Sequence, residues 1–303
     1  MPEPDPAENL IITAAAGYRE EQLRPFLASL RHYSPAASLW LIIDRLNPEF
    51  QQSVRAWFPG CAFFPVPPSP LRDFGRKRKW ARSVLKRLVK WSGSRKLAMR
   101  LLEINYLRYP IIRDLLSSRN PPGGNVLLCD SRDVVFQADP FAGGWPPLWT
   151  CQEDRRIEEC ELNSSWLRRA GGEAAFRQAK HQRIVCSGIT GGRVDRMRNY
   201  LQHVSEVVEQ LAPRIPLTVG DQGIHNYLVR LRPDLGFTVF PNGCHLAAHL
   251  AGTPLADLII ENHQVRLRHC AEVPAILHQY DRHPSLAALV QSRWANATPE
   301  ASR

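Results

Sequence analysis

Two aspartates at the end of an apolar run are the residues of this chain that most directly suggest chemistry. Residues 126–129 read Val-Leu-Leu-Cys, Asp130 follows them, and Asp133 directly precedes a second apolar run over 134–136. A carboxylate is costly to bury unless another group pairs with it. Hard divalent cations such as Mg²⁺ and Mn²⁺ favour oxygen ligands. The pattern predicts a buried strand that presents two carboxylates to Mn²⁺ or Mg²⁺; the alternative is an aspartate-rich turn in which Arg132 pairs with one of them.

Other small or polar residues follow the expected strands in the same way. They are Ala14 to Tyr18 after the first strand, Ser187 and Gly188 after another, His278 at the end of the last, and Asp221 with Gln222 at a helix start. In open α/β sheets, ligands bind beyond the carboxyl ends of the strands. We therefore expect these residues to converge on one site with the aspartates.

The elements that must position these residues alternate between strand and helix. Expected strands at 10–14, 39–43 and 62–66 are separated by expected helices at 20–32 and 48–57. This alternation predicts an α/β protein with a mostly parallel, doubly wound sheet and helices on both faces. Further along, the pattern predicts a helix over 96–117 kinked at Pro110, strands at 125–129, 184–188, 237–240 and 275–277, and helices at 195–211, 221–230 and 285–294. We expect one catalytic domain over 1–303 with a disordered tail at 295–303.

The positive charge of the chain is concentrated in one segment. The formal net charge is +10, and residues 72–100 hold twelve of the 39 Lys and Arg residues but only one of the 29 acids. Several prolines, at 65, 67, 68 and 70, mark the start of this segment. We interpret 67–100 as a basic, amphipathic helical insertion in a near-neutral body.

Three interpretations of this insertion are open. A basic helix with tryptophans suits an anionic bilayer surface, and its composition also suits nucleic-acid backbones, which we consider unlikely. The third is a solvated helix that packs on the body through its apolar stripe. The membrane interpretation is favoured, and the residues expected to carry it are Arg76, Lys77, Arg78, Lys79, Trp80, Lys86, Arg87, Lys90 and Trp91.

Cysteine usage and the amino terminus favour a reducing compartment. The seven cysteines are widely spaced with no Cys-x-x-Cys pair, which argues against a disulfide framework or a zinc cluster. The acidic, proline-rich start lacks the features of a secretory signal. We expect a cytoplasmic protein, which the basic insertion would place peripherally on the inner face of the membrane.

Four motifs in order resemble those of a known enzyme group. They are CDSRDVVFQADPF (129–141), CSGITGG (186–192), DQGIHNYL (221–228) and LHQYDRHP (277–284). Together they are similar to the glycogenin and galactinol synthase type of retaining nucleotide-sugar glycosyltransferases, which have the Rossmann-like GT-A fold. The resemblance covers about residues 9 to 290 outside the basic segment.

The resemblance implies a role for each matching position. It implies metal binding by Asp130, Asp133 and His278, although two residues separate the aspartates here instead of the usual one. It implies catalytic roles for Asp221 and Gln222, close to the reacting carbon. The donor-binding residues that it implies are Ala15, Ala16, Tyr18, Arg108, Asp130, Ser187 and Gly188.

The resulting hypothesis is metal-dependent transfer of a sugar from a nucleoside-diphosphate sugar, with a UDP-sugar favoured, to a hydroxyl acceptor on a lipid-linked or polysaccharide substrate. Asn163 and Trp166 are candidates for the acceptor side, whereas the glutamate-rich stretch 153–161 is typical of a solvated helix face. His225, His245 and His249 receive no role. Two alternatives remain: a non-enzymatic basic adaptor for membranes or nucleic acid, and a metal-dependent phosphohydrolase that uses the same aspartates.

Overall fold

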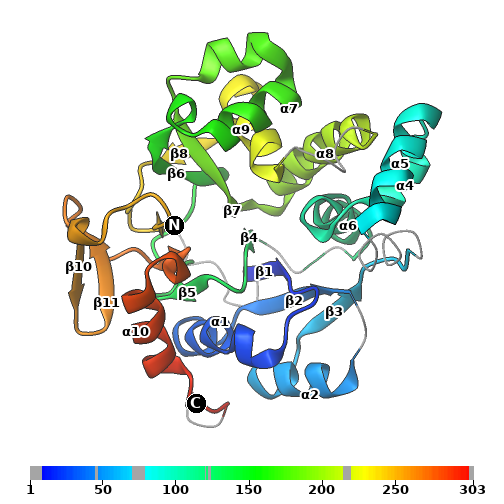
Figure 1. Cartoon of the computed structure of the whole chain (residues 1–303). Coiled ribbons are helices and arrows are strands. Elements are labelled where there is room, and N and C mark those ends of the chain that lie inside the picture. Colours follow the sequence, from blue (N-terminus) through cyan, green and yellow to red (C-terminus); the bar gives the residue numbers. More distant parts are fainter. Residues whose placement is uncertain are drawn as a thin grey trace.

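The computed structural model of the chain (Figure 1) describes residues 9–44, 47–69, 79–119, 121, 124–213 and 220–299. The side chains at 79–82, 86 and 90 also lie outside the description. Of the expected membrane-binding residues, Arg76, Lys77 and Arg78 therefore lie outside the described residues.

A seven-stranded sheet forms the centre of the molecule (Figure 1). Its strand order is β3 (Ala62–Pro65), β2 (Ser38–Ile43), β1 (Asn9–Ala14), β4 (Asn125–Cys129), β7 (Arg183–Arg193), β6 (Leu148–Arg156) and β8 (Thr238–Phe240). The β3–β2, β2–β1, β1–β4 and β6–β8 pairs are parallel, whereas β7 runs antiparallel to both β4 and β6. The predicted mainly parallel α/β sheet is confirmed.

Helices cover both faces of this sheet because its strands are apolar on both sides. Side chains alternate along a strand, so Ile11 packs in one buried cluster while Leu10 and Ile12 pack in the other. The first cluster includes side chains of α1 (Glu20–Tyr33), α2 (Pro48–Trp57) and α10 (Pro284–Trp294). The second includes side chains of α6 (Ile104–Arg119), α8 (Val194–Leu211) and α9 (Asp221–Leu231).

A second, three-stranded sheet carries His278. Its order is β5 (Val134–Phe136), β12 (Ile276–His278) and β9 (Ala247–His249), with β12 antiparallel to β5 and parallel to β9. His278 pairs with Val134 on one side and with His249 on the other. Because Val134 directly follows Asp133, this register places the imidazole beside the aspartates. His278 thus reaches them from a separate sheet and not, as expected, from the main one.

The basic insertion contains two helices, α4 (Lys79–Ser92) and α5 (Arg95–Leu101), which lie beside α6 at one edge of the molecule (Figure 1). The expected single helix over 96–117 is wrong. α5 ends at Leu101, the backbone at Leu102 is extended (φ −64°, ψ 145°), and α6 starts at Ile104 with Pro110 inside it. An extended residue breaks the helical hydrogen bonds, so the interruption falls at 102–103 and not at the proline.

The remaining elements complete the body around the two sheets. β6 is followed by a 3₁₀ turn at Ile157–Glu159 and by α7 (Glu161–Ala179), so Glu153 lies in a strand and the expected solvated helix over 153–161 is wrong. The hairpin of β10 (Leu258–Glu261) and β11 (Gln264–Leu267) and 3₁₀ turns at Pro233–Leu235, Leu255–Asp257 and Tyr280–Arg282 follow.

Among the described helices, none combines the length and the apolar composition that crossing a bilayer requires. Of the tail expected at 295–303, residues 300–303 lie outside the described part of the chain. Closer to α10, the Ala295 carbonyl accepts a hydrogen bond from Arg24, and Ala297 packs against the core.

Candidate active site

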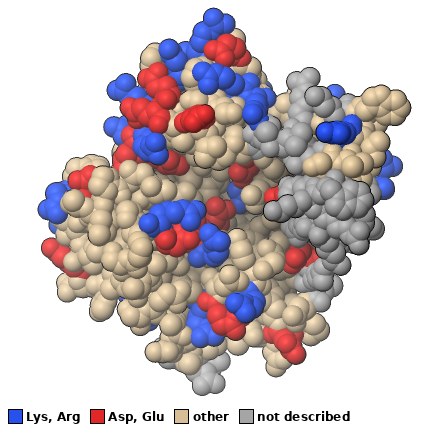
Figure 2. Space-filling model, viewed as in Figure 1, with Lys and Arg blue, Asp and Glu red and all other residues tan. Residues whose placement is uncertain are grey.

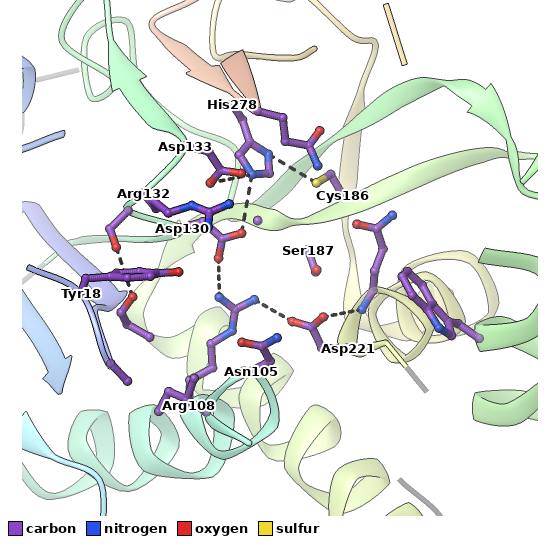
Figure 3. Close-up of a pocket in the computed structure, with 18 residues that line it drawn as sticks. Tyr18, Asn105, Arg108, Asp130, Arg132, Asp133, Cys186, Ser187, Asp221 and His278 are labelled. Atoms are coloured by element: carbon purple, nitrogen blue, oxygen red, sulfur yellow. Dashed lines mark hydrogen bonds and ion pairs between the residues drawn. The ribbon is translucent and has the colours of Figure 1, made fainter. Parts of the chain in front are cut away.

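A polar cavity of about 260 Å³ opens where the two sheets meet. In Figure 2, acidic and basic side chains lie in a hollow near the middle of the face shown. The lining residues come from segments far apart in the sequence, which Figure 3 draws together. They include Ala14, Ala16, Tyr18, Ile104, Asn105, Arg108, Asp130, Ser131, Arg132, Asp133, Trp166, Cys186, Ser187, Gly188, Asp221, Gln222, His278 and Gln279.

Asp130, Asp133 and His278 form a group that could hold a metal ion (Figure 3). The His278 Nε2 lies 3.5 Å from Asp130 Oδ2 and 3.7 Å from Asp133 Oδ1. Two ligand atoms bound at about 2.1 Å to one ion are separated by roughly 3–4 Å, so these spacings fit a shared ion. The His278 side chain is 2% exposed and that of Asp130 is 37% exposed. The imidazole thus forms the inner wall, and Asp130 faces the cavity.

Backbone contacts fix the three side chains in place. The Asp130 N–H donates to the Gly188 carbonyl (2.9 Å), and the Gln279 N–H, next to His278, donates to the Asp133 carbonyl (2.7 Å). Gln279 adopts a left-handed conformation, with φ of 63°. For a residue other than glycine this conformation is uncommon and indicates local strain. It occurs where β12 ends at the cavity.

Gly188 lies in the middle of β7 and not in a turn, because β7 continues to Arg193 as the antiparallel neighbour of β4. The expected strand end at Ser187 and Gly188 is therefore wrong, although both residues line the cavity. A Cβ on Gly188 would lie 2.3 Å from His278 Cε1 and 2.9 Å from Asp130 Oδ2. Glycine is thus the residue that allows the metal-binding group to pack against β7.

Arg108 on α6 connects the metal-binding group to Asp221 on α9. Its Nη1 donates to Asp130 Oδ1 at 2.5 Å, and its Nη2 donates to Asp221 Oδ2 at 2.8 Å. The neighbouring Tyr109 hydroxyl also donates to Asp221 (3.2 Å). The guanidinium therefore lies between two carboxylates in the cavity wall, where it could also contact an anionic ligand. Its buried Nε–H has no partner within the described residues.

The pKa values of the three candidate ligands are shifted in different directions. Burial opposes ionisation of Asp130, but Arg108 and His278 bring the pKa of that carboxyl below its ordinary value. Burial raises the pKa of Asp133. Burial also opposes charge on His278, yet Cys186, Asp130 and Asp133 hold its pKa well above the ordinary value. These surroundings favour the protonated form of His278 when no metal is bound.

A second group, Cys186, His249 and His278, could also hold a metal ion, and all three residues are buried. His278 Nδ1 lies 3.0 Å from His249 Nδ1 and 3.5 Å from Cys186 Sγ. A neutral imidazole offers one lone pair, so His278 serves either this group or the aspartates. The aspartate group faces the cavity, where ions can enter, and we take it as the site. His249, for which no role was predicted, contacts Nδ1 of His278, the ring nitrogen on the side away from the aspartates.

Gln222, at the start of α9, is held by two side chains. Its Nε2 donates to Glu153 Oε1 (3.2 Å) and to Asn163 Oδ1 (3.0 Å). Glu153 is 7% exposed, and burial raises the pKa of its carboxyl. Sequence reasoning missed Glu153; the signal was the strand pattern of 148–156, which would have placed it on a buried position. Asn163 reaches the site through Gln222, and Trp166 lines the cavity directly.

Of the remaining expected donor-binding residues, some line the cavity and one does not. Ala16 and Tyr18 line the cavity, whereas Ala15 belongs to the buried core. Ser187 lines the cavity. Lining residues that sequence reasoning missed include Asn105 on α6, Ser131, whose hydroxyl donates to the Ala14 carbonyl, and Gln279. Ser131 and Gln279 adjoin the predicted ligands, and that adjacency was the available signal.

Comparisons with known proteins support the fold alone. No protein-family model and no curated protein matches this sequence. Among solved structures, an active-site mutant of LgtC, a GT-A glycosyltransferase, superposes with a TM-score of 0.52 at 14% sequence identity, over 93% of this chain and 95% of that one. The fold is of the GT-A type. The Asp130, Asp133 and His278 group thus lies in the pocket of a GT-A fold, while the resemblance to the glycogenin type has no support from this neighbour.

Proposed function

We propose that this protein is a metal-dependent glycosyltransferase that moves a sugar from a nucleoside-diphosphate sugar to a hydroxyl acceptor. The observation that carries the proposal is the Asp130, Asp133 and His278 group in the cavity of a GT-A fold. We favour a UDP-sugar as donor and Mn²⁺ or Mg²⁺ as the ion. Such an ion, when bound, would neutralise the negative charge that develops on the departing diphosphate.

The residues around the group have roles that fit this reaction. Arg108, beside Asp130, would position the anionic end of the donor through charge-assisted hydrogen bonds. Ala16, which leaves room for close approach, and Tyr18 would form the wall for the base and ribose, and Ser187 and Gly188 would line the sugar subsite. Ala15 would support that wall from the core.

Asp221 and Gln222 would lie near the anomeric carbon, where a carboxylate or amide stabilises an oxocarbenium-like state. Burial raises the pKa of Asp221 even though Arg108 pairs with it. Trp166 and Asn163 would define the acceptor side. The proposal that the enzyme is of the glycogenin type rests on the order of the four sequence motifs alone.

The test is a panel of nucleoside-diphosphate sugars incubated with the purified protein, with and without Mn²⁺, in the presence and absence of simple sugar and lipid-linked hydroxyl acceptors. We expect acceptor-dependent release of nucleoside diphosphate that requires the ion and is accompanied by a glycosylated product. Ion-dependent cleavage that is equally fast without acceptor, and that breaks the diphosphate to give nucleoside monophosphate and sugar 1-phosphate, would favour a phosphohydrolase. If no nucleotide sugar is bound or cleaved, the non-enzymatic adaptor becomes the favoured alternative.

A further inference from the structure

The apolar stripe of α4 faces outward. Val84, Leu88 and Trp91 follow one another at spacings of four and three, which places them on one face of a helix. Their side chains are 46%, 49% and 88% exposed, and they are three of the six large apolar residues that are exposed in the described part of the chain. A grouped exposed apolar surface of this kind marks an interaction site more often than isolated apolar residues do.

The opposite side of α4 holds the helix on the body. Val89 is fully buried and belongs to the second core cluster together with Ala98 of α5 and Leu102. The helix is thus anchored without its stripe. This arrangement contradicts the sequence-based alternative in which Val84, Leu88 and Trp91 pack against the protein.

Basic side chains lie on α4 and on the helix that follows it. Arg87, Arg95, Lys96 and Arg100 are exposed on α4 and α5. The sequence has no acidic residue between Asp73 and Glu103. An apolar face with bulky residues, flanked by basic side chains, is complementary to a lipid surface that is anionic at the headgroups and apolar beneath them.

We propose that α4 docks this protein on an anionic lipid bilayer. Trp91, Leu88 and Val84 enter the interfacial layer, and Arg87, Arg95 and Lys96 contact the headgroups. α5 leads directly to α6, whose first residues, Ile104 and Asn105, line the cavity. Docking therefore holds the wall of the cavity near the lipid surface. Resting on the proposed function, this assigns the acceptor to hydroxyls of lipid-linked molecules at that surface.

Vesicle binding of the full chain, without donor or metal ion, tests the docking separately from catalysis. We expect co-sedimentation with phosphatidylcholine–phosphatidylglycerol vesicles, weak binding to pure phosphatidylcholine, and release as salt rises. Brominated lipid should quench part of the tryptophan fluorescence, and Trp91→Phe should reduce that quenching while leaving the melting temperature unchanged.

Matched variants distinguish vesicle binding through α4 from non-specific binding through other exposed apolar residues. The double change Leu88→Ser with Trp91→Ser should weaken vesicle binding by at least about tenfold, and Arg87→Gln by roughly fivefold, equivalent to ~1 kcal/mol near the surface. Leu162→Ser on α7, where Leu162 is 61% exposed, should have no effect. Vesicle binding unchanged in the double variant, weakened equally by Leu162→Ser, or absent in a chain that binds nucleic acid instead would overturn the proposal.

Discussion

Gly188 and His278 are packed so closely that a single added carbon would not fit between them. A Cβ on Gly188 would lie 2.3 Å from His278 Cε1 and 2.7 Å from His278 Nε2, the nitrogen that faces the aspartates. The geometry of the candidate metal-binding group therefore depends on a residue that cannot itself bind a ligand through a side chain.

Gly188→Ala should displace the imidazole. Overpacking in a close-packed interior costs about 1–3 kcal/mol, and we expect a loss of that order in the free energy of unfolding together with weaker binding of Mn²⁺. Denaturant unfolding and a Mn²⁺ titration measure the two effects. Gly60→Ala is the control, because no atom lies within 4 Å of its added Cβ; equal behaviour of the two variants would refute the packing argument.

Arg108 should contribute far more to stability than Arg113 on the same helix. Removing one partner of a buried ion pair leaves an uncompensated charge and costs about 3–5 kcal/mol, and Arg108→Met leaves Asp221 without its cation and Asp130 with His278 alone. Arg113 pairs with Asp114, which is 69% exposed, so Arg113→Met should cost about 1 kcal/mol or less. Denaturant unfolding in metal-free buffer gives the free energy of unfolding of each variant. Comparable losses in the two variants would contradict a stabilising role for the buried ion pairs of Arg108.

The two aspartates should respond differently to neutralisation in the absence of metal. The pKa of Asp130 is lowered in the fold, so its ionisation contributes stability that is present above its ordinary pKa and lost as the pH falls through the folded value. The pKa of Asp133 is raised, so its ionisation opposes folding at neutral pH. Asp130→Asn should therefore lower the melting temperature at pH 7, whereas Asp133→Asn should preserve or raise it. Equal destabilisation by the two substitutions would show that the ionised carboxylate of Asp133 also stabilises the fold through an ion pair.

Affinity for Mn²⁺ should increase with pH. His278 must lose its proton before Nε2 can bind an ion, and its neighbours hold its pKa well above the ordinary value. Below that pKa, each ion bound displaces one proton, so affinity should fall by about tenfold for each unit of decreasing pH. Calorimetric titrations at several pH values in buffers of different ionisation enthalpy count the protons released. Affinity that does not change between pH 6 and 8 would mean that His278 is not a ligand.

The local pattern was sufficient for much of the fold and for the residues at the cavity. Apolar runs with small or acidic residues behind them identified β1 and β4, and with them Ala16, Tyr18 and Asp130. The nearness of His278 to the aspartates followed from the order of the motifs, but its sheet did not, because a strand of three residues is positioned by pairing with β5 and β9 and has little periodicity of its own.

Other features depend on contacts that no single segment encodes. Arg108 could be placed on a helix, but its pairing with Asp130 and Asp221 joins three distant segments. Glu153 is buried because it lies in β6, but the glutamate-rich composition of 153–161 favoured a solvated helix over a strand. The orientation of α4 could not be predicted, because an apolar stripe can pack either against a protein core or against a lipid surface. The burial of Val89 in the structure decides the orientation.

The most direct test of the central claim is the binding of a nucleoside diphosphate with and without Mn²⁺, measured by calorimetry on the unmodified protein and on His278→Ala. His283→Ala is the control, since His283 lies outside the metal-binding group and its Nε2 bonds the Leu250 carbonyl. We expect Mn²⁺ to strengthen nucleotide binding in the unmodified protein and in His283→Ala. In His278→Ala that strengthening should require about 10–100-fold more Mn²⁺. Because the buried imidazole pairs with both aspartates, this variant should also melt at a lower temperature in metal-free buffer, so binding is measured well below its melting transition. Nucleotide binding that is indifferent to Mn²⁺ and chelator, or a Mn²⁺ requirement that is the same in all three proteins, would contradict the account.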